Sequence, residues 1–212
     1  MKKRFLKSAL SLLLLAAMLV TAVSCQAENE AEVLSLAKEL LSASVGVNEM
    51  YMGEGILHDE NGRRIGAYYE ALPASLEKYG VSSLAAIQAA AARVYSSVVC
   101  AQLQSSVLTA IQVDGQLISP KRYYDLEEKD KNLLMVASTY EPLGVGTNGF
   151  EDCRVLFARG GRAEISVTVL SYYEDKPVQR TENVILRLVK ENGEWRLDDL
   201  SLRFYDKTLL ED

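Results

Sequence analysis

The chain has 212 residues, of which 49% are hydrophobic and 25% are charged, and its formal net charge is −6. This composition excludes the fibrous and disordered classes, and a chain of this length can bury a core without disulfides or metals. The acidic balance argues against a nucleic acid as a partner, because phosphate backbones are bound by basic surfaces.

The first 24 residues predict export. The basic segment Lys2-Lys3-Arg4 precedes an apolar run, residues 9–23, that is too short for a membrane span of about 20 residues and is typical of a signal peptide. Residues 1–24 also hold four basic and no acidic side chains, so their removal leaves 188 residues with a formal net charge of −10. The mature domain is therefore more acidic than the whole chain.

The apolar run ends in Ala22-Val23-Ser24-Cys25, which resembles the lipobox of bacterial lipoproteins. In that family the cysteine is diacylated, and cleavage makes it the first residue of the mature chain. The resemblance implies lipidation of Cys25, with a lipid anchor in the outer face of the cytoplasmic membrane, and makes residues 25–29 a short tether. Ala22 replaces the leucine that is usual at its position. The alternative is ordinary cleavage after Ala27.

Helical patterns dominate residues 30–115. Apolar residues recur at helical spacing over 30–45, and Gly46 is the expected stop. Asn61-Gly62 predicts the turn of a hairpin. A short helix is expected over 73–79, because proline favours the first turn of a helix.

Two more helices are expected, one beginning near Ser82 or Ser83 and one over about 98–111. From residue 116 to 212 the pattern changes to the period of two that is typical of antiparallel strands. Helices followed by strands predict an α+β fold with N-terminal helices packed on a curved antiparallel sheet, in one domain. The candidate strands are 117–126, 132–140, 153–159, 162–173, 179–190 and 194–203.

Residues 184–199 (VILRLVKENGEWRLDD) resemble the closing hairpin of NTF2-like, or cystatin-like, domains. In that family a long strand turns at a Lys-Glu-Asn-Gly sequence, and the next strand opens with a buried tryptophan. The resemblance implies that Trp195 and Leu197 share a buried face of a curved sheet. Such a sheet can enclose a small apolar ligand or a ketosteroid-isomerase-like site, for which Asp125 would be the candidate base.

A looser resemblance spans residues 66–199. It consists of Gly-Ala-Tyr-Tyr at 66–69, Arg-Val-Tyr-Ser at 93–96, Arg-Tyr-Tyr at 122–124, the strand Leu-Leu-Met-Val-Ala at 133–137 and the tryptophan hairpin. This order is similar to secreted inhibitors of peptidoglycan DL-endopeptidases, the autolysins that separate Gram-positive cells. Those proteins are two-lobed and without catalysis of their own. The resemblance implies a cell-wall hydrolase as partner.

No pattern predicts a cofactor or a metal. Residues 144–149 match G-x-G-x-x-G, but they lead into a strand rather than a helix, so no dinucleotide site is expected. His58 is the only histidine and there is no Cys-x-x-Cys, which leaves no zinc site. Cys100 and Cys153 could form a disulfide in an exported chain, or be two small buried residues.

Tyrosine is the enriched aromatic residue, with eleven against four phenylalanines and one tryptophan. It suits both protein interfaces and the rim of a core. A ligand or partner surface is predicted at Tyr69, Arg122, Tyr124 and Tyr172. The sequence as a whole predicts a non-enzymatic envelope lipoprotein that acts as a ligand-binding or protein-interaction module. The alternatives are an autolysin inhibitor and a ketosteroid-isomerase-like enzyme.

Overall fold

The computed structural model describes residues 28–109, 111–113, 116–119, 121–128, 131–140, 148–173 and 176–201. The predicted signal peptide and Cys25 lie outside these residues. The described elements are α2 (Glu30–Met52), β1 (Arg64–Ile65), β2 (Tyr68–Glu70), α3 (Pro73–Tyr79), α4 (Leu84–Val94), α5 (Ser97–Val107), β3 (Ile111–Val113), β4 (Gln116–Ser119), β5 (Tyr123–Glu128), β6 (Lys131–Ala137), β7 (Asn148–Arg159), β8 (Arg162–Tyr173), β9 (Lys176–Glu191) and β10 (Glu194–Leu197).

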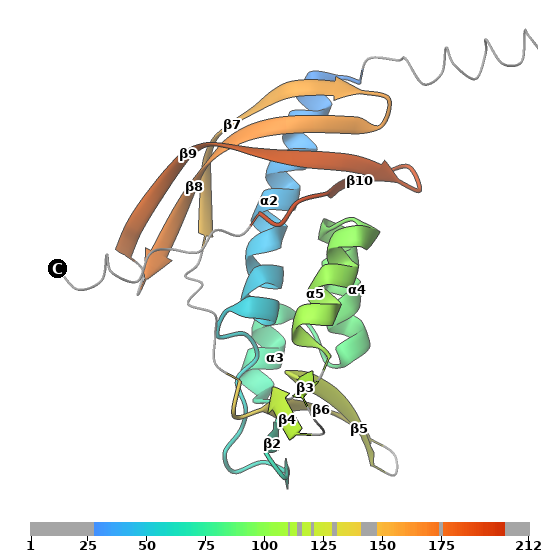
Figure 1. The fold of residues 1–212 in the computed structure, drawn as a ribbon, viewed down its shortest axis with the longest axis vertical. Helices are drawn as coiled ribbons and strands as arrows, with labels where there is room; N and C mark the ends of the chain where they lie inside the picture. Colours follow the sequence, from blue (N-terminus) through green and yellow to red (C-terminus); the bar gives the residue numbers. More distant parts are fainter. Residues whose placement is uncertain are drawn as a thin grey trace, which may run out of the picture.

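Helix α2 runs along the long axis of the molecule (Figure 1). Asn29 caps its first turn by accepting a hydrogen bond from the Ala31 N–H at 3.1 Å. The prediction that the helix stops at Gly46 was wrong, since it continues to Met52. Val47 and Tyr51 extend the buried stripe by another turn, and this burial outweighs the roughly 1 kcal/mol that an internal glycine costs a helix. The 23 residues of α2 make it about 35 Å long.

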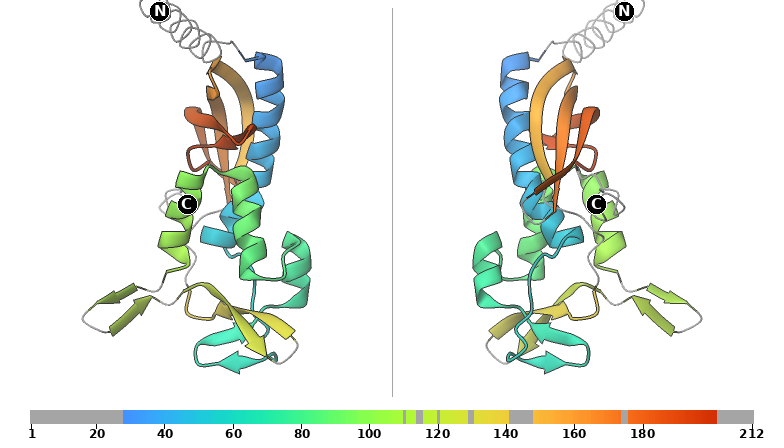
Figure 2. Two further views of the ribbon diagram at one scale, coloured as in Figure 1. Left: turned by 90° about the vertical axis from the view of Figure 1, so that its right-hand side faces the viewer. Right: turned by 90° about the vertical axis from the view of Figure 1, so that its left-hand side faces the viewer.

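Strands β7 to β10 form an antiparallel sheet in the order β10-β9-β8-β7, here called the upper sheet. It packs against the first half of α2 (Figures 1 and 2). Its tight turns lie at the predicted places, because Gly160, Gly161, Asn192 and Gly193 all have positive φ, as type I′ turns require. The burial predicted for Trp195 and Leu197 is confirmed. The other apolar residues of this face are buried as well: Ala163, Ile165, Val167, Val169, Val184, Leu186 and Leu188.

The upper sheet is curved by two bulges that flank its middle strand β8. Asp152 in β7 and Asn183 in β9 have φ values of 49° and 54°, and the register with β8 shifts at both places. The Arg154 guanidinium donates to the Asn183 side-chain oxygen at 2.9 Å and so links the two bulged strands. Bulges bend the strand that carries them. The expected α+β fold, with helices against a curved antiparallel sheet, is confirmed.

The single sheet expected over residues 116–212 does not form. Strands β1, β2, β6 and β5 form a separate antiparallel sheet in that order, here called the lower sheet, and β3 pairs with β4 alone. The apolar strand β6 is buried on both faces, from Leu134 to Ala137, so it needs a neighbour on each edge. Strand β2, from the helical half of the chain, supplies one of them.

Two local predictions in this region need correction. The strand expected over 117–126 is divided into β4 and β5, with Pro120, which cannot donate to a strand ladder, between them. Asn61-Gly62 does lie in a turn, where the Gly62 N–H donates to the Asp59 oxygen at 3.0 Å, but the paired hairpin β1–β2 turns at Gly66, with φ of 60°.

The helices expected near Ser83 and over about 98–111 form, but the second of them, α5, ends at Val107, and residues 111–113 are strand β3. Ser83 caps α4 by accepting from the Ala86 N–H, and Ser96 caps α5 by accepting from the Val99 N–H. Helix α3 begins at Pro73 and ends at Gly80, which adopts φ of 63°. These helices join the upper sheet and α2 in one hydrophobic core.

A buried polar cluster fixes the point where α2, the α4–α5 junction and the chain after β10 meet. The Tyr95 hydroxyl donates to the Asn48 side-chain oxygen at 2.7 Å and lies 2.8 Å from the Ser201 hydroxyl. Asn48 in turn donates to Ser201 at 3.0 Å, and Ser201 donates to Ser44 at 2.7 Å. Because its members satisfy one another, the cluster specifies one arrangement of these elements.

Candidate functional site

The guanidinium of Arg122 is the most unusual feature of the described residues. Arg122 lies just before β5 and is 1% exposed. Its Nη2 donates to the backbone oxygens of Gly53 and Glu54, both at 2.6 Å. The ring of Tyr140 covers the guanidinium at 4.0 Å. The remaining groups, Nε and Nη1, are buried and have no hydrogen-bond partner among the described residues.

The Tyr123 hydroxyl reaches the same end of α2. It donates to the Met50 oxygen at 2.7 Å and accepts from the Ile56 N–H at 3.2 Å. The last carbonyls of a helix have no partner within the helix. In α2 the Met50 oxygen accepts from the Tyr123 hydroxyl and the Tyr51 oxygen accepts from the Tyr140 hydroxyl at 3.1 Å. Arg122 binds the two backbone oxygens that follow the helix. Burial raises the pKa of Tyr123 to about 12, against the opposing effect of the Arg122 cation.

Gly55 makes this close approach feasible. Its φ is 63°, and a Cβ at this position would lie 2.4 Å from Arg122 Nη2 and 2.5 Å from the Tyr123 hydroxyl. Only glycine fits both the left-handed backbone and the space. Gly55 and Tyr140 were not predicted from the sequence, although two glycines in Gly53-Glu54-Gly55 are a usable signal for a special backbone.

A cavity of about 270 Å³ borders Arg122 and is here called the Arg122 cavity. Leu57 and Glu54 are exposed at its rim. The other residues that line it are Ile56, His58, Val136, Ala137, Ser138 and Tyr140. Apolar walls with one buried cation and a few polar groups are typical of a small-ligand site.

The four residues of the predicted binding surface do not come together. Tyr69 pairs with Val136, as Tyr123 does, whereas Tyr124 pairs with Met135. Residues paired with successive positions of one strand point to opposite faces, so Tyr69 and Tyr124 lie on opposite faces of the lower sheet.

Each tyrosine has its own surroundings. Tyr69 stacks against His58, with 5.0 Å between ring centroids, and Tyr124 meets Tyr68 edge to face at 4.7 Å. Tyr172 belongs to β8 in the upper sheet, where a Cβ on Gly149 would lie 3.1 Å from its ring. Only Arg122 lines a described cavity.

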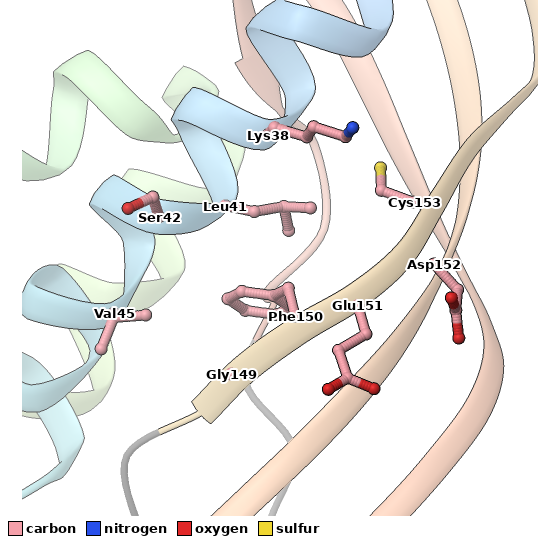
Figure 3. A pocket seen from close by; sticks show the side chains of 9 residues that line it. All are labelled: Lys38, Leu41, Ser42, Val45, Gly149, Phe150, Glu151, Asp152 and Cys153. Carbon is pink, nitrogen blue, oxygen red and sulfur yellow. The ribbon is translucent and has the colours of Figure 1, made fainter.

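A second hollow lies between α2 and β7, here called the α2–β7 groove, with a volume of about 610 Å³. Leu41 and Phe150 face each other across it, and the Lys38 amine points toward the Cys153 thiol (Figure 3). Glu151 and Asp152 point away from α2 in the same view and form ion pairs with Arg180 at 2.6 and 3.1 Å. Glu151 and Asp152 therefore stabilise the upper sheet and do not contribute charge to the groove.

The possible disulfide does not form, because Cys100 and Cys153 are both free. Cys100 is buried in α5 and donates weakly to the Tyr95 oxygen at 3.6 Å, whereas Cys153 faces α2 from β7. Burial raises the pKa of both thiols. A raised pKa keeps a thiol protonated and poorly nucleophilic.

Asp125, the candidate base of an isomerase-like site, binds the first turn of α4. Its carboxylate accepts from the Leu84 N–H at 2.8 Å, and it lines neither the Arg122 cavity nor the α2–β7 groove. Within the described part of the chain, no three His, Cys, Asp or Glu side chains are grouped to hold a metal ion. No helix in that part combines the length and apolar character needed to cross a bilayer.

No protein-family model and no curated protein matched this sequence. The candidate site therefore rests on its geometry.

Proposed function

We propose that the protein is an envelope lipoprotein, anchored at Cys25, that acts without catalysis as a binding module held away from the membrane. The observation that carries the proposal is the position of Glu28. Its N–H donates to the Ala158 oxygen at 3.3 Å, and its carboxylate accepts from the Gly161 N–H at 3.3 Å. The same carboxylate lies 3.6 Å from the Lys190 amine. The chain is thus fixed at the β7–β8 turn.

Glu28 is the third residue after Cys25, and three residues of extended chain span about 10 Å. A lipid on Cys25 would therefore hold the β7–β8 end of the upper sheet beside the bilayer. The lower sheet lies at the opposite end of α2 (Figure 2), about 35 Å further away. This arrangement favours the lower sheet and the Arg122 cavity as the part that meets ligands or partners in the envelope.

Replacing Cys25 with alanine is expected to release the protein from the membrane. A single anchor carries the attachment, since the acidic domain has no electrostatic attraction to anionic lipids. Detergent-phase partitioning of cell extracts should place the wild type in the detergent phase and Cys25→Ala in the aqueous phase. Cys153→Ala is the matched control and should partition like the wild type. Retention in the detergent phase of Cys25→Ala from which residues 1–24 have been removed would contradict the anchor.

Inhibition of a peptidoglycan DL-endopeptidase is a second candidate. The observation that favours it is the pair of sheets at opposite ends of α2, the two-lobed organisation that the resemblance implies. Purified lipoprotein in detergent, added to a panel of these enzymes, should then reduce peptidoglycan cleavage in proportion to its concentration, and the unfolded protein should not. Unchanged cleavage across the panel would remove this candidate and leave the anchor unaffected.

A further inference from the structure

We infer that the Arg122 cavity binds a small monoanionic carboxylate. The inference rests on the proposed role as a binding module and is independent of the lipid anchor. Its starting point is a buried cation without an anion, since Arg122 forms no ion pair with any described carboxylate. Buried charges in proteins are almost always paired, because an unpaired ion loses its hydration without compensation.

The structural role of Arg122 uses only part of its guanidinium. Both backbone oxygens that it binds are reached through Nη2. Two donor groups, Nε and Nη1, have no partner in the described part of the chain, and an arginine has five N–H donors in a fixed plane. The two carbonyls and the rings of Tyr123 and Tyr140, 5.2 and 4.0 Å from the guanidinium, therefore leave Nε and Nη1 without an acceptor. A carboxylate in the adjoining cavity supplies the missing charge and acceptors.

The surroundings favour one negative charge rather than two. Among the described residues, Arg122 is the only arginine or lysine that lines the cavity, and the Glu54 side chain is exposed at its rim. A phosphate dianion would place its second charge against Glu54 without a second cation to balance it. Part of the remaining wall is apolar, with Ile56 and Val136 buried, and His58, Ser138 and Tyr140 add polar groups to it. A carboxylate that carries a short apolar substituent fits this wall and the volume of about 270 Å³.

The test is an isothermal titration calorimetry experiment. Propionate is titrated into the purified lipoprotein in detergent at constant ionic strength. Propionamide, the neutral analogue, and inorganic phosphate are titrated in parallel. We expect saturable binding of propionate at one site per chain, with at least tenfold weaker binding of propionamide and phosphate. Phosphate binding as tight as propionate binding, or no saturable binding of propionate, would overturn the inference.

Variants connect the binding to the cavity. Arg122→Gln should weaken propionate binding at least tenfold, but it also removes contacts to the end of α2. Glu54→Gln is therefore the decisive variant, because the backbone oxygen that Arg122 uses is retained and only the exposed carboxylate changes. It should tighten propionate binding about two- to fivefold, by removing a like charge.

Glu60→Gln is the matched control in the neighbouring turn, where the side chain is exposed and lines no described cavity, and it should change nothing. Equal affinities of Glu54→Gln, Glu60→Gln and the wild type would place any carboxylate binding elsewhere and overturn the inference. Cys25→Ala should bind propionate like the wild type, so failure of the anchor and failure of the cavity are separate results.

Discussion

Gly55→Ala is expected to lower the free energy of unfolding by about 3–5 kcal/mol. A non-glycine residue in the left-handed region costs roughly 1–2 kcal/mol, and Gly55 has φ of 63°. The new Cβ would also displace Arg122 Nη2 and the Tyr123 hydroxyl, which bind the backbone oxygens at the end of α2. Each buried hydrogen bond broken in this way costs roughly 1–3 kcal/mol. Urea unfolding followed by Trp195 fluorescence measures the loss.

Gly80→Ala is the matched control for this prediction. Gly80 also has φ of 63°, but a Cβ there would meet no atom within 4 Å. Only the cost of placing a non-glycine residue in the left-handed conformation should apply. The free energy of unfolding should therefore fall by about 1–2 kcal/mol. Equal losses in the two variants would show that Gly55 is needed for its backbone conformation alone, and not to let Arg122 and Tyr123 reach the end of α2.

The upper sheet could be predicted from sequence because its strands alternate and its turns carry their own signals. Val184, Leu186 and Leu188 stand on one face by period alone, and Asn192-Gly193 specifies the turn that follows. The N-cap of α4 could be predicted for the same reason, since serine acts on the two or three residues after it. These are local effects, and local sequence is sufficient to determine them.

Features that depend on distant segments could not be predicted. The pairing of β2 with β6 joins residues that are more than 60 positions apart, and no local pattern selects that partner. The end of α2 was predicted wrongly because burial of Tyr51 in the core extends the helix past Gly46. Arg122 was found as a candidate, but its grouping with Tyr69, Tyr124 and Tyr172 was not borne out by their positions, because strand register determines which rings share a face.

Raising the pH from 10 to 12 is expected to destabilise the fold strongly. The folded pKa of Tyr123 is raised by burial from 10 to about 12, and burial also raises the pKa of Tyr51, Tyr95 and Tyr140. Above pH 10 the unfolded chain releases these protons while the folded chain keeps them. Stability is therefore fully present below pH 10 and lost as the pH rises toward 12. Tyr123 alone contributes a loss of about 1.4 kcal/mol per pH unit in this window.

Urea unfolding at intervals between pH 8 and pH 12 measures this loss, and Tyr123→Phe assigns the part that belongs to Tyr123. At pH 8 the variant should be less stable by about 1–3 kcal/mol, because the Met50 oxygen and the Ile56 N–H lose their partner. Its further loss up to pH 12 should be smaller than that of the wild type by about 2–3 kcal/mol. If the unfolding free energies of the two proteins fell in parallel with pH, the Tyr123 hydroxyl would be accessible to solvent. The lower sheet would then not bury the hydrogen bonds that Tyr123 forms at the end of α2.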